Sequence, residues 1–78
     1  MSMSSQLICL YNLLQAEGVS RGFSRLEHQG GTNPHLFIFH RGSEQRHVVI
    51  FENELLDTAS HNRLSENVKR RLAEDLAG

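Results

Sequence analysis

The stretch that decides the fold of this chain is HLFIFHRGSEQRHVVIF, residues 35–51. Two runs of strand-forming residues, 35–40 and 47–51, flank a short polar segment that contains Gly42 and Ser43. Two such runs around a short loop with turn-forming residues are typical of a β-hairpin. We therefore predict an antiparallel hairpin at the centre of the fold.

The pairing of the hairpin decides which side chains share a face. We predict that Arg41 lies opposite Arg46 across the turn. One face then carries Leu36, Ile38, His40, His47, Val49 and Phe51. The other face carries Phe37, Phe39, Val48 and Ile50. Both faces are largely apolar, whereas an antiparallel sheet with one face in water alternates apolar and polar residues. A register shift of one residue exchanges the faces without making either polar.

An apolar second face has to be covered by something. We predict that the face formed by Phe37, Phe39, Val48 and Ile50 binds a protein partner or a second copy of the chain, since exposed apolar patches mark interaction sites. The alternative is that two helices clasp the sheet from opposite sides, which leaves neither face open.

Residues 5–16, upstream of the hairpin, have helical periodicity. Apolar side chains follow the i, i+3, i+4, i+7 spacing at Leu7, Leu10, Tyr11 and Leu14. Ser4 or Ser5 is expected to cap the start of this helix, and Gly18 lies just past its end. Residues 23–29 then predict an edge strand, and Gly30–Pro34 is a dense turn signal.

A closing helix is predicted downstream. Its apolar residues recur every four positions, at Leu64, Val68, Leu72 and Leu76. Ser65 can cap a late start of this helix, and Ser60 or Asn62 an earlier one. Residues 53–62 are ambiguous between a short helical turn and a loop.

The resulting order, αβββα, predicts one α+β domain over residues 1–78, with residues 1–4 disordered. The expected architecture is a three-stranded antiparallel β-meander flanked by N- and C-terminal helices, most simply with both helices on one face. A chain of this length hides only about 60% of its unfolded surface. A second subunit is one way to add stability, and we expect a homodimer.

Composition favours a cytoplasmic protein. Cys9 is the only cysteine, which excludes an intrachain disulfide and indicates a reducing compartment. The apolar run 7–14 is far shorter than the roughly 20 residues of a membrane-spanning helix. No basic residue precedes that run, so we expect neither a secretory signal nor a membrane partner.

Motifs for chemistry are sparse. With the predicted pairing His40 faces His47, and two imidazoles at that separation can share a zinc ion. No Cys-x-x-Cys, His-x-x-x-His or His-Glu-x-x-His spacing completes such a site. No serine lies in a nucleophile elbow, and no phosphate-binding motif follows Gly30-Gly31. We predict no catalytic residue, no metal and no cofactor, and hence a protein that is not an enzyme.

Three carboxylates, Glu52, Glu54 and Asp57, lie within six residues. An acidic patch can block a nucleic-acid-binding groove because it offers negative charge where phosphate would lie. We therefore expect a protein-binding module that regulates or inhibits a larger macromolecule, like the accessory proteins of bacteria and phages. It would act through the apolar sheet face, the acidic patch or both.

Nucleic-acid binding is the alternative function. The candidate phosphate contacts are Arg41, Arg46, Lys69, Arg70 and Arg71. The αβββα order resembles the double-stranded-RNA-binding domain over most of the chain, and this resemblance implies RNA contacts from the first helix and from a basic start of the last helix. Residues 64–67, however, contain no lysine run, and eight basic against nine acidic residues leave a net charge of −1. That charge balance disfavours binding dominated by phosphate.

Overall fold

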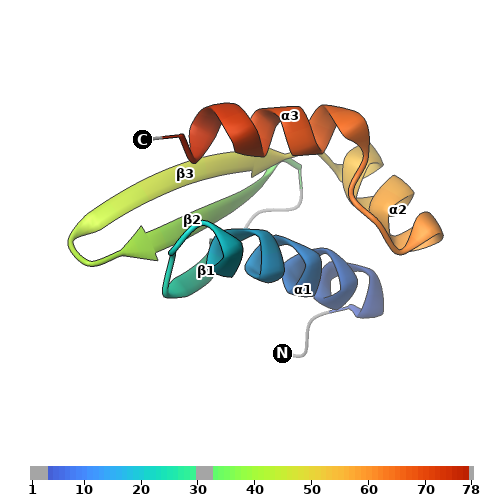
Figure 1. The fold of residues 1–78 in the computed structure, drawn as a ribbon. Helices are drawn as coiled ribbons and strands as arrows, with labels where there is room; N and C mark the ends of the chain where they lie inside the picture. Colours follow the sequence, from blue (N-terminus) through green and yellow to red (C-terminus); the bar gives the residue numbers. More distant parts are fainter. Residues whose placement is uncertain (1–3, 30–32, 78) are drawn as a thin grey trace.

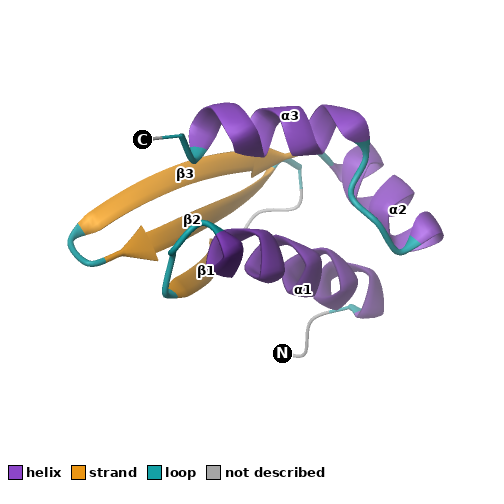
Figure 2. Ribbon diagram, viewed as in Figure 1, coloured by secondary structure: helices purple, strands orange, loops and turns teal. Residues whose placement is uncertain are grey.

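The computed structural model describes residues 4–29 and 33–77. Its elements, in chain order, are α1 (Ser5–Ser20), β1 (Arg25–Gln29), β2 (His35–Arg41), β3 (Glu44–Ile50), α2 (Glu52–His61) and α3 (Glu66–Asp75) (Figures 1 and 2). The predicted α+β class and αβββα order are confirmed, and the ambiguous segment 53–62 is mostly the helix α2. The predictions for residues 1–3 and 30–32 lie outside the described residues.

The three strands form an antiparallel sheet in the order β1-β2-β3. Arg41 lies opposite Glu44, so the hairpin turn consists of Gly42 and Ser43 alone. Gly42 has φ +60°, a left-handed conformation that glycine adopts without steric cost and that two-residue hairpin turns require. The predicted pairing of Arg41 with Arg46 is therefore wrong by two residues. An even shift leaves the side chains within β2 and β3 on their predicted faces. Phe51, which was predicted to end the second strand, lies outside β3 and precedes α2.

The helices gather on one side of the sheet (Figure 1). The face beneath them carries Phe37, Phe39, Val48 and Ile50, each 0% exposed and in one cluster with apolar residues of all three helices. The prediction that these four form an open partner-binding face is wrong, because they are the centre of the core. The opposite arrangement, with helices clasping both faces, is not found either.

Serine side chains cap the N-termini of α1 and α3. The Ser4 hydroxyl accepts from the Leu7 N–H, and the Ser65 hydroxyl accepts from the Val68 N–H. Both capping predictions are confirmed, with Ser65 marking the later of the alternative starts of the last helix. Helix α1, however, runs to Ser20 rather than ending near Ala16. The residue with positive φ beyond its end is Gly22, at +88°.

Gly18 is thus a buried residue inside α1, and its role is to allow a close approach. A Cβ atom at this position would lie 2.8 Å from Cδ2 and 2.9 Å from Cε2 of Phe39. The Phe39 ring also packs edge-on against Phe23, with ring centroids 5.8 Å apart. The absence of a side chain at residue 18 therefore sets how closely α1 packs on the sheet.

We expect Gly18→Ala to destabilise the fold although it improves the helix. Alanine is favoured over glycine in a helix interior by about 1 kcal/mol. Overpacking against the fully buried Phe39 ring costs about 1–3 kcal/mol, which outweighs that gain. Urea denaturation at neutral pH measures the difference. In a Phe39→Leu background the penalty should shrink; an equal penalty in both backgrounds would contradict the proposed clash.

Candidate functional site

The sheet face that the helices leave uncovered is a candidate surface for binding, and we term it the open face. Strand pairing places on it Arg25, Glu27 and Gln29 of β1, Leu36, Ile38 and His40 of β2, and Gln45, His47 and Val49 of β3. The central strand is apolar for most of its length, and both outer strands are mainly polar. Interfaces between proteins have this arrangement of an apolar centre within a polar rim.

The centre of the open face is sheltered by its rim. Ile38 is only 6% exposed although no helix covers it, because its cross-strand neighbours are Glu27 and His47. Leu36 and Val49 are half-buried. The apolar surface on the open face is consequently a narrow strip. It is smaller than the apolar binding surface that the sequence predicted.

A polar cluster lies at one end of the open face. His40 is 9% exposed, and its Nε2 lies 3.0 Å from Glu27 Oε1 and 3.3 Å from Arg25 Nη2. The hydrogen bond from His40, followed by one from Gln29, holds the pKa of the Glu27 carboxyl below its usual value. Glu27 is therefore ionised at neutral pH. The rim of β1 thus presents one carboxylate and one guanidinium side by side.

Side chains from the helices bind both edge strands. The Tyr11 hydroxyl of α1 donates to the Leu26 carbonyl oxygen of β1 at 2.6 Å. The Arg71 guanidinium of α3 donates to the Val49 carbonyl oxygen of β3 at 3.0 Å. An edge carbonyl that already has a donor is less available to a strand from another chain. Association through the edges is therefore disfavoured relative to association through the open face.

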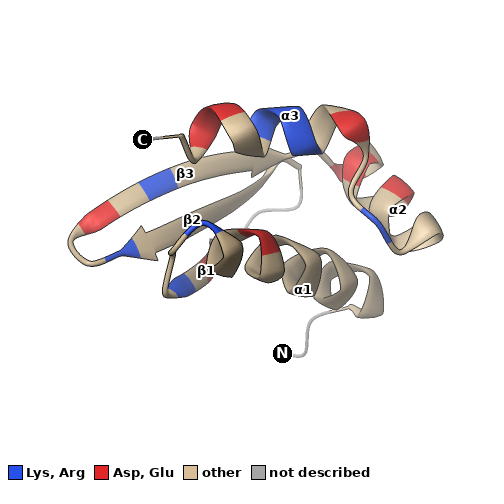
Figure 3. Cartoon of the chain, in the orientation of Figure 1, with Lys and Arg blue, Asp and Glu red and all other residues tan. Residues whose placement is uncertain are grey.

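The three predicted acidic residues all lie on α2, and each has a basic neighbour. Glu52 Oε2 is 2.7 Å from His35 Nε2, and Asp57 Oδ1 is 3.3 Å from His61 Nδ1. Glu54 accepts two hydrogen bonds from Arg71, at 2.7 and 2.9 Å. Figure 3 shows acidic and basic residues interspersed over the helices. The carboxylates do not form a patch of unpaired negative charge.

The predicted phosphate contacts are also engaged. Arg41 and Arg46 both bind Glu44 beside the hairpin turn, Arg71 binds Glu54, and the Lys69 ammonium lies 3.8 Å from Glu66. Arg41 additionally lies 4.4 Å above the centre of the Phe23 ring. Four of the five predicted cations therefore contact a carboxylate, and only Arg70 adds charge without one in the described part of the chain.

The histidine pair predicted across the hairpin is not formed. His40 lies opposite Gln45, and His47 lies opposite Ile38. Within residues 4–29 and 33–77, no group of three histidine, cysteine or acidic side chains is placed to hold a metal ion. The two-residue error in the register is the reason why the pair was predicted.

A different histidine cluster, absent from the sequence predictions, lies on the helix side of the sheet. His28 Nε2 is 3.3 Å from His35 Nδ1, and His35 Nε2 is 2.7 Å from Glu52 Oε2. We term these three residues the imidazole chain. Its members come from β1, β2 and α2, so no spacing within the sequence reveals it. Only the register of β1 against β2, which places His28 opposite Phe37, could have indicated it.

Comparison with known proteins assigns this chain to no family, since no family model, no curated protein and no solved structure matches it. The resemblance to the double-stranded-RNA-binding domain remains one of element order. Among the described residues, no helix has the length and apolar character needed to cross a bilayer.

We expect Glu54 to be a structural residue. Its side chain is 14% exposed and is bound by the Arg71 guanidinium, so Glu54→Gln should lower the free energy of unfolding by about 1–3 kcal/mol at pH 7. Asp57→Asn is the matched control, because the pair of Asp57 with His61 is about half exposed and contributes at most about 1 kcal/mol.

The effect of Glu54→Gln should depend on pH in a defined direction. The hydrogen bonds from Arg71, and then that from the Phe51 N–H, hold the pKa of Glu54 below 4.5. A lowered carboxyl pKa stabilises the fold above that pH, and the stabilisation is lost as the pH falls through the folded-state pKa. Urea denaturation from pH 7 downward should show the two proteins converging. Equal effects of Glu54→Gln and Asp57→Asn at pH 7 would contradict the structural role.

Proposed function

We propose that this chain is a small, non-enzymatic protein-binding module that pairs with a second copy of itself through the open face of the sheet. The observation that carries the proposal is a strip that no described helix covers, formed by the half-buried Leu36 and Val49 beside the sheltered Ile38 within a polar rim. The single cysteine is consistent with a reducing, cytoplasmic location.

The charges of the open face favour a second copy as the occupant. The rim of β1 carries Arg25 and Glu27, one charge of each sign, and the rim of β3 carries neutral Gln45 and the imidazole of His47. A two-fold axis brings the same surface of both copies together, so a face with balanced charges is complementary to itself. A strongly acidic or basic partner would gain little from this face.

The size of the open face predicts that this association is weak. Three strands about 4.8 Å apart, with the seven residues of β2 at about 3.3 Å each, give a footprint of about 330 Å². Stable interfaces bury about 800 Å² on each partner. The dimer should therefore be transient and should form only at high protein concentration.

In such a dimer the helical layers face outward. The regulatory or inhibitory role expected from the sequence would then belong to those layers, and not to a patch of free carboxylates, because Glu52, Glu54 and Asp57 already have partners within the chain. Nucleic-acid binding has less support, since the net charge is −1 and most of its predicted contacts bind carboxylates.

We expect Leu36→Glu and Val49→Glu to abolish self-association. Either substitution places a charge in the apolar part of the paired open faces, where it loses water. Sedimentation equilibrium from about 10 µM to about 1 mM should show the average mass of the natural chain rising toward that of a dimer. Dimerisation in this concentration range corresponds to a weak binding free energy. Both variants should stay at the mass of one chain.

Leu56→Glu is the control variant. Leu56 is 43% exposed on α2, outside the open face, so this substitution adds the same charge without touching the proposed contact. Its association should match that of the natural chain. A natural chain that remains monomeric at the highest concentration, or a loss of association in the control alone, would rule out the open face as the site of pairing.

A further inference from the structure

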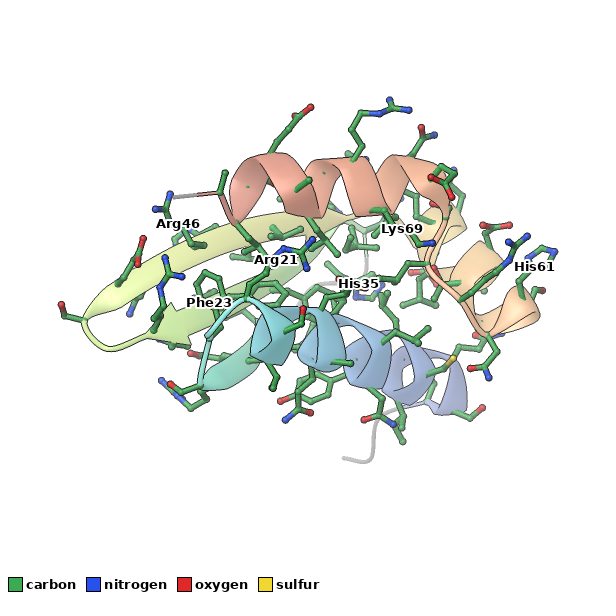
Figure 4. The ribbon with its side chains drawn as sticks, in the orientation of Figure 1. Arg21, Phe23, His35, Arg46, His61 and Lys69 are labelled. Carbon is green, nitrogen blue, oxygen red and sulfur yellow. The ribbon has the colours of Figure 1, made fainter. Side chains whose placement is uncertain are left out.

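We propose that the imidazole chain of His28, His35 and Glu52 is an acid-sensitive latch that holds the start of α2 against the ends of β1 and β2. This inference needs no partner and goes beyond the proposed function, because these residues lie on the helix side of the sheet. Figure 4 shows His35 in the interior, toward the α2 end of the molecule.

The latch joins three elements that meet at one place. His28 is near the end of β1, His35 begins β2, and Glu52 begins α2. Other contacts at the start of α2 include the hydrogen bond from the Glu52 N–H to Asn33 Oδ1, at 3.2 Å, and that from the Phe51 N–H to Glu54 Oε1, at 3.0 Å. Glu54 is also bound by Arg71, which joins this turn to α3. Among the described residues, the Glu52–His35 contact is the polar side-chain link between α2 and the central strand, beside the packing of Leu55 in the core.

The number of protons on the His28 and His35 rings decides whether the chain of hydrogen bonds is complete. A neutral imidazole has one donor and one acceptor nitrogen, and a charged one has two donors. His35 Nε2 faces the Glu52 carboxylate and therefore donates to it. With both rings neutral, His28 Nε2 donates to His35 Nδ1 across 3.3 Å. One added proton, on either ring, still leaves a donor facing an acceptor. Two added protons leave two N–H groups facing each other, and the contact fails.

The surroundings make the second proton unfavourable. His35 is 7% exposed, and the His28 ring packs against Phe37 with ring centroids 4.9 Å apart. Burial, and then the charge of His35, lower the pKa of His28 from its ordinary value of 6.5. The charge that faces the two rings from α2 is Glu52. Among the described residues, the Tyr11 hydroxyl of α1 donates to β1 and Glu54 of α2 is bound by Arg71 of α3, so neither supplies a free anion to the rings.

The direction of the pH effect follows from the lowered pKa of His28. The unfolded chain takes up the proton at a higher pH than the folded chain does, so acid favours the unfolded or opened state. The stabilisation from His28 is present above pH 6.5 and is lost as the pH falls below it. Opening should begin at α2, since Glu52 is its link to the latch.

His28→Gln separates the titration from the hydrogen bond. The glutamine amide keeps an N–H donor for His35 Nδ1 but takes up no proton. Urea denaturation at pH 7.5 and pH 5 should show a larger loss of the folding equilibrium constant in the natural chain than in His28→Gln, about ten-fold for each unit by which the pKa of His28 is lowered. His61→Gln is the control, since His61 is about half exposed at the far end of α2, outside both the latch and the open face, and it should keep the pH dependence of the natural chain.

Hydrogen exchange of the natural chain gives a second test that does not depend on the variant folding. The α2 amides, relative to those of α1, should lose protection between pH 7.5 and pH 5 after correction for intrinsic exchange rates. Unchanged relative protection of α2 would overturn the latch. The same pH dependence in His28→Gln and in the natural chain would overturn it as well.

Discussion

The two-residue turn at Gly42 and Ser43 is the constraint on which the rest of the structure depends. It places Arg41 opposite Glu44, and every later pair of β2 and β3 follows from that one. Because side chains alternate along a strand, the same pairing gathers Phe37, Phe39, Val48 and Ile50 on one face. This face has no polar residue at its centre. It is therefore the face that the helices cover, and the other face is left open.

The helices pack closely against that core and also bind the edges of the sheet. Gly18 lets α1 lie directly against the Phe39 ring, while Tyr11 and Arg71 reach past the core to bind carbonyl oxygens of the two edge strands. Most charged side chains are held in pairs within the chain, so the surface lacks a field of one sign. Such a surface suits weak, charge-balanced contacts between proteins better than the backbone of a nucleic acid.

The central strand β2 carries histidine on both of its faces, in two different settings. His35 lies on the helix side, where it joins His28 and Glu52 in the interior. His40 lies on the open face, where it supports the ionised Glu27 at the rim. The first cluster links secondary-structure elements of the same chain, and the second shapes a surface that another molecule can meet. The alternation of one strand thus places one histidine in the proposed latch and the other on the open face.

The sequence alone determined the α+β class, the αβββα order and the two faces of the hairpin, because local periodicity depends on neighbouring residues. It also supplied the candidate caps, among which the structure selects Ser4 and Ser65, but it left the segment that forms α2 ambiguous. The hairpin register was not determined by the sequence, since one polar loop allows several turns. Only the tertiary structure decided which apolar face becomes the core. It also decided that Gly18 packs against Phe39 inside α1 instead of ending the helix, and that His28 and His35 lie in line with Glu52. These features join residues far apart in the chain, and their free energy comes from packing that no local pattern encodes.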